Sequence, residues 1–158
     1  MMHFQVSRSS RSPEMRQMKP TSASTFRIGA PLRRNATDPE QVEEHPGGAT
    51  VTGIIGTAMA GVTAGVPAYS DHTYDVNGTI PVYIATDEYD WLGTLINAGT
   101  VVTPAKATHE GVSYGMIKVN GEWYIDEADT TALVARVVRA LPEINAVLFR
   151  WITSAIAA

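Results

Sequence analysis

The sequence predicts an all-β fold: a small β-barrel or β-sandwich with an extended, largely unstructured N-terminal arm. Thr, Val, Ala and Gly dominate from Gly47 onward, and β-branched residues interrupted by glycine favour short strands. Turn signals recur there about every 8–12 residues, which is typical of sandwiches and barrels. The N-terminal third instead combines serine, proline and arginine with few large apolar side chains, so it lacks the burial needed to offset the entropy of ordering.

Residues 1–48 are therefore predicted to be a basic disordered arm and linker, and residues 49–158 a β-rich domain. Residues 1–34 carry seven basic side chains and one acidic side chain, a formal charge of +6, whereas the remainder carries −10. Such an asymmetry is typical of a tail that binds through its charge. One helical turn is expected over residues 38–44, and His45-Pro46-Gly47-Gly48 should end it at the domain boundary.

The arm carries scattered apolar residues between its arginines, at spacings that suit an extended segment lying in a groove of a partner. A terminus without function remains the alternative interpretation. The residues expected to bind the partner are Phe26, Arg27, Ile28, Leu32, Arg33 and Arg34.

Eight strands are expected in the domain. Residues 133–140 could form a helix, but Val134, Val137 and Val138 favour a strand. The expected strands cover residues 51–55, 66–69, 80–85, 91–97, 112–119, 122–126, 133–140 and 146–152.

The sharpest local signal is the pair Asn120-Gly121 between two strand-like runs, which predicts a β-hairpin. A two-residue loop would place Val119 opposite Glu122. A three-residue loop with Gly121 in the left-handed conformation would place Lys118 opposite Glu122. We favour the second register because it brings opposite charges together across the strands.

No residue pattern indicates catalysis, a cofactor or a metal, so the protein is expected not to be an enzyme. It has no cysteine, which excludes a disulfide framework and a thiolate site. Acidic clusters lack the spacing of a calcium loop and are read as solvated turns, although sequence leaves paired carboxylates open. The histidines, expected to be solvated in loops and linkers, are His3, His45, His72 and His109.

Glycine-rich and aromatic positions are interpreted structurally. The apolar stretch over residues 51–68 is broken by threonine, glycine and proline, so no membrane span is expected. The basic N-terminal residues are not followed by an apolar region, so no secretory signal is expected. The three tryptophans, Trp91, Trp123 and Trp151, are expected in the core or an interface. Bends or close backbone approaches are expected at Gly53, Gly56, Gly61 and Gly65.

Several phrases resemble the small capsid decoration (cement) proteins of tailed bacteriophages. The resemblance covers residues 49–152 and leaves out the arm. Its phrases are TIPVYIAT at residues 79–86, LINAGTVV at 95–102, SYG at 113–115, GEWYID at 121–126 and DTT at 129–131.

The resemblance implies a non-enzymatic virion structural protein, made in the host cytoplasm, that binds the capsid exterior. It would act there as a trimer or dimer and stabilise contacts between major capsid proteins. One alternative is a carbohydrate- or host-surface-binding module, with Asp87, Asp90 and Trp91 as a sugar platform. The other is a virion protein that binds nucleic acid through the arm; this is disfavoured because the domain is acidic.

Overall fold

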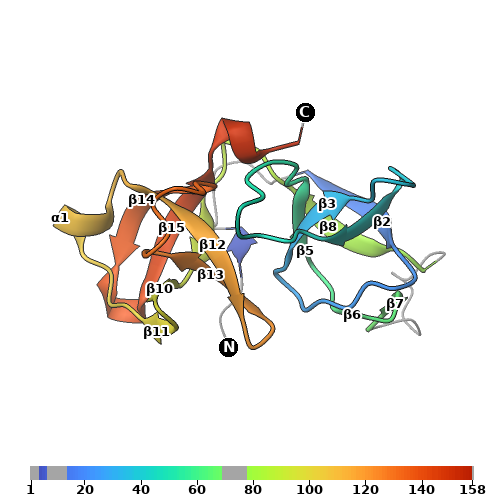
Figure 1. Ribbon diagram of the computed structural model, residues 1–158, viewed down its shortest axis with the longest axis horizontal. Coiled ribbons are helices and arrows are strands. Elements are labelled where there is room, and N and C mark those ends of the chain that lie inside the picture. The colour runs from blue at the N-terminus through green and yellow to red at the C-terminus, as the bar shows by residue number, and fades with distance from the viewer. Residues whose placement is uncertain (1–3, 7–13, 69–77, 158) are drawn as a thin grey trace.

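The computed structural model describes residues 4–6, 14–68 and 78–157, which fold into two β-rich lobes (Figure 1). We call residues 14–68 and 78–86 the barrel lobe, and residues 4–6 and 87–157 the sheet lobe. The predicted all-β fold is confirmed, and one lobe is a closed barrel.

The barrel lobe contains a closed barrel and a small two-stranded sheet. The barrel order is β2-β4-β3-β5-β8, in which β2 and β4 are parallel and the other neighbours are antiparallel. The strands of this lobe are β2 (Met15–Pro20), β3 (Pro31–Arg34), β4 (Gln41–Glu44), β5 (Gly56–Ala58), β6 (Val62–Thr63), β7 (Val66–Pro67) and β8 (Ile80–Ile84).

The barrel corrects the expectation of an unstructured arm that reaches Gly48. Three of the five barrel strands, β2, β3 and β4, come from that segment, and the chain continues through residue 48 into β5 without a domain boundary. Only a few apolar side chains are needed, because each short strand buries one or two: Met18 on β2, Leu32 on β3 and Val42 on β4. Residues 1–3 and 7–13 of the predicted arm lie outside the described residues.

The helical turn predicted over residues 38–44 is also wrong, because β4 begins at Gln41. The Asp38 carboxylate closes a turn instead. It accepts hydrogen bonds from the Glu40 amide at 3.1 Å and from the Gln41 side-chain amide at 2.8 Å. Aspartate favours this local bonding over helix at such positions.

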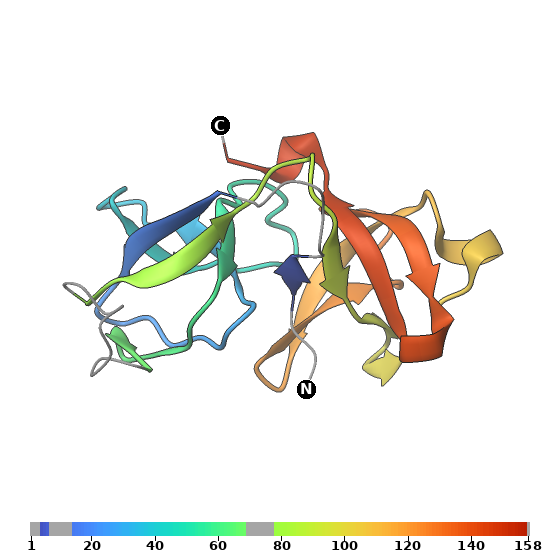
Figure 2. The same cartoon turned by 180° about the vertical axis from the view of Figure 1, so that it is seen from behind.

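The sheet lobe is an eight-stranded sheet in the order β1-β9-β15-β14-β12-β13-β10-β11 (Figures 1 and 2). The predicted strand at 133–140 is confirmed as β14. The elements are β1 (Gln5–Val6), β9 (Trp91–Gly93), β10 (Leu95–Asn97), β11 (Thr100–Val101), α1 (Lys106–His109), β12 (Ser113–Val119), β13 (Glu122–Asp126), β14 (Ala135–Leu141), η2 (Pro142–Ile144), β15 (Ala146–Trp151) and η3 (Thr153–Ala155).

Three predicted strands differ from the observed ones. The first, over 51–55, is replaced by β5, which begins at the residue directly after it. The second, over 66–69, is represented by β7, and Tyr69 lies outside the described residues. The third, over 91–97, is divided at Thr94 into β9 and β10, which pair with β15 and β13 respectively.

The lobes share one hydrophobic core and several polar contacts. The Ile54 amide donates to the Ala155 carbonyl at 3.0 Å, and the Ala157 amide donates to the Ile54 carbonyl at 2.8 Å. Trp123 Nε1 donates to Glu44 Oε1 at 2.8 Å, and this tryptophan is 4% exposed. Trp91 and Trp151 are fully buried, so the placement of all three tryptophans in the core is confirmed.

The predicted hairpin is present, but with the two-residue loop. Val119 pairs with Glu122 and Lys118 with Trp123, so the favoured three-residue register is wrong. Both Asn120, at φ +51°, and Gly121, at φ +82°, occupy the left-handed region. This pair of positive angles is the requirement of a type I′ turn, which matches the twist of the flanking strands.

Replacing Gly121 by valine should lower the free energy of unfolding by about 1–2 kcal/mol, because a β-branched residue is strained in the left-handed region. Chemical denaturation followed by circular dichroism measures the loss. Gly121→Asn is the matched control, since asparagine tolerates this conformation better. An unchanged melting temperature in Gly121→Val would contradict the turn assignment.

Candidate functional site

The apolar residues predicted to contact a partner do not form one exposed surface. Phe26 is 4% exposed and Leu32 is fully buried, both within the hydrophobic core, whereas Ile28 is 38% exposed. Phe26 pairs with Val62 through two backbone hydrogen bonds. The assignment of Phe26 and Leu32 to partner grooves is therefore wrong, because their burial stabilises the barrel lobe itself.

The three arginines of the same prediction are bonded within the chain. Arg27 Nη1 donates to Glu122 Oε1 at 2.6 Å and so connects the two lobes. Arg33 Nε donates to Glu43 Oε1 at 2.8 Å on the neighbouring strand, and Arg34 Nη1 donates to the carbonyl of Pro39 at 2.7 Å. These bonds reduce the charge that the arginines offer to a partner.

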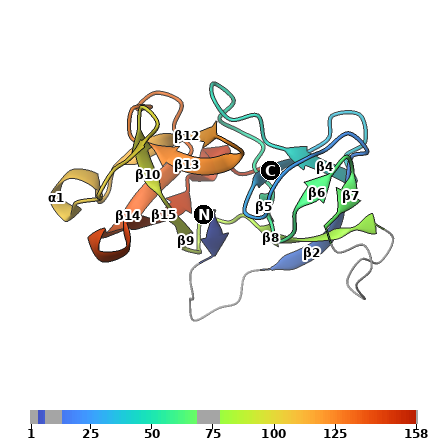
Figure 3. The same cartoon turned by 90° about the horizontal axis from the view of Figure 1, so that it is seen from below.

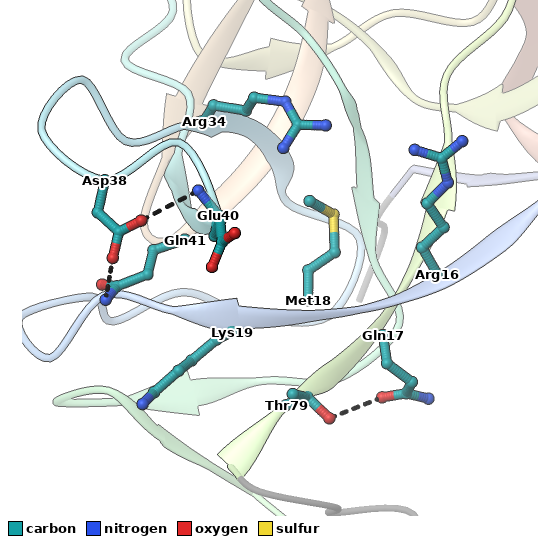
Figure 4. A pocket seen from close by; sticks show the side chains of 9 residues that line it. All are labelled: Arg16, Gln17, Met18, Lys19, Arg34, Asp38, Glu40, Gln41 and Thr79. Atoms are coloured by element: carbon teal, nitrogen blue, oxygen red, sulfur yellow. Dashed lines mark hydrogen bonds between the residues drawn. The ribbon is translucent and has the colours of Figure 1, made fainter.

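A depression of about 480 Å³ lies on the barrel lobe beside β2 (Figure 4). In Figure 4, the side chains of Arg16, Met18 and Arg34 lie on one side of β2, while those of Gln17 and Lys19 lie on the other. Its lining residues are Arg16, Gln17, Met18, Lys19, Arg34, Asp38, Glu40, Gln41 and Thr79.

Most polar groups of this depression already have partners. Arg16 Nε donates to Glu14 Oε1 at 2.6 Å, and both side chains are more than half exposed. Arg34 and Asp38 make the bonds described above. With two carboxylates opposing its three cations, the depression offers only weak attraction for an anion.

A second cationic surface lies on the outer face of the sheet lobe, where three exposed arginines project from β14 and β15. Arg136 on β14 and Arg150 on β15 are direct cross-strand partners, a like-charge arrangement that destabilises a sheet. Arg150 Nε donates to Asp90 Oδ1 at 2.6 Å. Among the described residues, Arg136 and Arg139 form no ion pair. We call Arg136, Val138, Arg139 and Arg150 the arginine strip.

A β-bulge in β14 places an apolar residue among the arginines of this strip. The register shifts between Val137 and Arg139, so Val138 is an extra residue without a cross-strand partner. As a result, the adjacent residues Val138 and Arg139 are both exposed, and Val138 is 40% exposed. Arginine beside exposed aliphatic surface is a common composition of protein interfaces. This site was not predicted from the sequence, although the run Arg-Val-Val-Arg at residues 136–139 interrupts the alternation expected of a strand.

Two histidines, predicted to be solvated, are buried instead. His45 is 1% exposed: its Nε2 donates to the Thr52 carbonyl at 2.8 Å, and its Nδ1 accepts from the Gly47 amide at 3.0 Å. His109 is 3% exposed, and its Nδ1 accepts from the Ala105 amide at 2.8 Å. Each ring satisfies loop backbone groups that burial removes from water. His3 and His72 lie outside the described residues.

The buried environment of His45 should make stability depend on pH. Desolvation is the main cause that lowers the pKa of His45 below 6.5, and the charge of Arg33 lowers it further, against the opposing bond to Thr52. The unfolded chain therefore binds more protons than the folded chain just below pH 6.5. Stability should be full above pH 6.5 and fall as pH decreases from there toward the folded-state pKa.

Urea unfolding between pH 7.5 and pH 5.5 measures this loss, and His45→Gln is the control because its amide does not titrate. The difference in unfolding free energy between the two proteins should change with pH in that window. A constant difference would show that His45 does not cause the pH dependence.

The acidic cluster at Asp126 and Asp129 forms turns in which the carboxylates bond to nearby backbone amides, as expected from the sequence. The Asp129 carboxylate accepts hydrogen bonds from the amides of Thr131 and Ala132, and these bonds lower the pKa of Asp129 although burial opposes them. Over the described residues, no group of three His, Cys, Asp or Glu side chains is placed to hold a metal ion. Another of the acidic clusters in the sequence, Asp71 with Asp75, lies outside the described residues.

The predicted role of Trp91 as part of a sugar-binding platform is wrong. Trp91 is fully buried against Trp151, with ring centroids 6.3 Å apart, so its face is not available for a sugar to stack on. Asp90 bonds to Arg150, and Asp87 accepts a hydrogen bond from Thr153 at 2.8 Å.

Across the parts of the chain that the structure describes, no helix is long and apolar enough to cross a membrane. Comparisons of the chain with protein-family models, curated proteins and solved structures find no match.

Proposed function

We propose that this chain is a non-enzymatic virion structural protein that binds the outer surface of an assembled phage capsid. There it stabilises contacts between major capsid proteins, as a homo-oligomer. The resemblance of residues 49–152 to capsid decoration proteins motivates the proposal, and the arginine strip is the observation that carries the choice of binding surface.

The strip supports docking because most of its charge is not bonded within the described residues: of its three arginines, Arg150 alone is paired, with Asp90. Most other cations on the described surface have a bonded partner, such as Arg27 with Glu122 and Lys118 with Glu44. Arg136 and Arg139, which have no ion-pair partner among the described residues, lie beside the exposed Val138. An acidic patch on the partner would relieve the repulsion between Arg136 and Arg150 and would bury Val138.

The charge of the rest of the sheet lobe favours a protein partner over nucleic acid. Residues 87–157 carry nine acidic and five basic side chains, a formal charge of −4. Such a lobe repels a phosphate backbone outside the strip. A local acidic patch on a protein can match the strip alone, and repetition on a lattice multiplies weak contacts.

The double charge reversal Arg136→Glu/Arg139→Glu should weaken attachment to undecorated heads about tenfold or more, because it replaces attraction by repulsion at two positions. Co-sedimentation with heads at increasing protein concentration measures the affinity. Arg16→Glu/Lys19→Glu on the barrel lobe is the matched control, since it changes the net charge equally.

The control variant should bind like the unmodified chain. If it loses binding while the strip variant keeps it, the docking surface is wrongly assigned. If the unmodified chain does not sediment with heads at all, the capsid proposal itself fails. Circular dichroism of each variant confirms that the fold is retained.

A further inference from the structure

The sheet lobe contains a socket for an aromatic side chain that a separate segment fills. Phe4 is 1% exposed, and its ring lies edge-on to Phe149 at 5.0 Å and to Trp151 at 5.5 Å between centroids. The missing side chain of Gly93 leaves the space: a Cβ there would lie 3.1 Å from the Phe4 ring and 2.9 Å from Phe149. The walls of this socket belong to β9 and β15, which pair with each other.

Phe4 directly precedes β1, and β1 is followed in the chain by a strand of the other lobe. Figure 3 shows β1 beside β9. Among the described strands, β1 lies at one edge of the eight-stranded sheet and pairs with β9 alone, through Gln5 with Leu92 and Val6 with Trp91. The next strand along the chain, β2, belongs to the barrel lobe. The edge strand of the sheet lobe is thus tethered through the other lobe.

We propose that β1 is an exchangeable strand: Phe4–Val6 of one copy can fill the socket and pair with β9 of a second copy. The barrel is closed without β1, and the other seven strands of the sheet pair with one another. Exchange therefore reproduces every β1 contact and leaves both lobes intact. Swapping an identical element between copies is a low-cost route to assembly for this reason.

The length of the segment between β1 and β2, which we call the tether, determines whether β1 pairs within its own chain or with a second copy. Eight residues separate Val6 from Met15, which limits the reach of the strand to about 30 Å from the start of β2. A short tether holds its strand at an effective concentration on the order of 1 mM. The chain should therefore fill its own socket when dilute and exchange strands when copies are concentrated or held side by side. This inference does not require the capsid proposal.

The absence of native cysteine allows a direct test by disulfide capture. Gln5 and Leu92 are direct antiparallel partners, whose Cα separation of about 4.5–5.5 Å suits a disulfide. Two single variants, Gln5→Cys and Leu92→Cys, are mixed, unfolded, refolded together and oxidised. A disulfide between the two chains can form in register only if β1 of one copy lies on β9 of the other.

Covalent heterodimer should be at least about tenfold more abundant after refolding near 1 mM than near 10 μM. The matched control pairs Gln5→Cys with Leu148→Cys, which lies one strand further from β1. Two strand spacings of about 4.8 Å exceed disulfide reach. Equal yields of heterodimer from the two mixtures would overturn strand exchange.

Two further variants make the result specific. The double variant Gln5→Cys/Leu92→Cys should form an intramolecular disulfide when it refolds dilute, and failure to do so would overturn the β1 register itself. Adding Phe4→Ala to the Gln5→Cys chain should reduce the heterodimer about tenfold, because the buried ring is the main anchor of the strand. An undiminished yield would show that the socket does not hold β1.

Discussion

Leu32→Ala should lower the free energy of unfolding by about 2–5 kcal/mol, the usual cost of truncating a fully buried leucine. Leu32 lies on β3, is fully buried, and pairs with Glu44 of β4 and Gly56 of β5. Removing its branched end would leave a cavity inside the closed barrel. Urea unfolding followed by far-UV circular dichroism measures the change.

Ile28→Ala is the matched control, because Ile28 comes from the same segment but is 38% exposed. It should cost less than about 1 kcal/mol. Equal and small losses of unfolding free energy in both variants would support the earlier prediction that residues 1–48 are disordered.

The three tryptophans lie in the sheet lobe, so their fluorescence reports on that lobe, whereas the Leu32 substitution perturbs the barrel lobe. Coincident transitions by fluorescence and circular dichroism would show that the shared core unfolds as one unit.

The barrel strands of the N-terminal segment were hidden from sequence analysis because they need so little apolar material. β2 has the sequence MRQMKP and buries only Met18 and Pro20. β4 has the sequence QVEE and fully buries only Val42. From amino-acid composition alone, such strands are predicted to be disordered. Their order comes from closure of the barrel, which joins β2 to β8 across more than sixty residues of sequence.

The later strands were predictable because their signals are local. β13 begins and ends at the predicted residues, and Asn120-Gly121 correctly marked the hairpin. The register failed for a tertiary reason. Lys118 bonds to Glu44 of the barrel lobe at 2.6 Å and Glu122 bonds to Arg27, so neither charge needs the other. Turn geometry then sets the pairing.

The candidate site was less accessible to sequence than the fold. Unpaired charge is a property of the folded surface, since Arg27, Arg33 and Arg34 looked available in the sequence and proved to be bonded within the chain. Arg136 and Arg139, in contrast, sit in a run that predicted a strand and nothing more. Only the bulge and the cross-strand register place their charges together on one face.

Gly56 occupies the tightest position of the barrel, which confirms its prediction as a site of close backbone approach. β5 lies between β3 and β8, where Gly56 pairs with Leu32 on one side and Ile84 on the other. A Cβ at this position would lie 2.1 Å from the Tyr83 carbonyl oxygen and 2.8 Å from Val82 Cγ1. The nearest atom is backbone, so it cannot move aside without disturbing the β5–β8 ladder.

Gly56→Ala should therefore lower the free energy of unfolding by about 3 kcal/mol or more, at the upper end of the cost of overpacking, because one methyl group forces β5 and β8 apart. Gly61→Ala is the matched control: its nearest neighbour, the Phe26 carbonyl oxygen, lies 3.5 Å from the added Cβ, an ordinary contact. That variant should stay within about 1 kcal/mol of the unmodified chain. Equilibrium unfolding in urea compares the two. A Gly56→Ala protein as stable as Gly61→Ala would mean that β5 does not close the barrel against β8, and the placement of the N-terminal strands would fail with it.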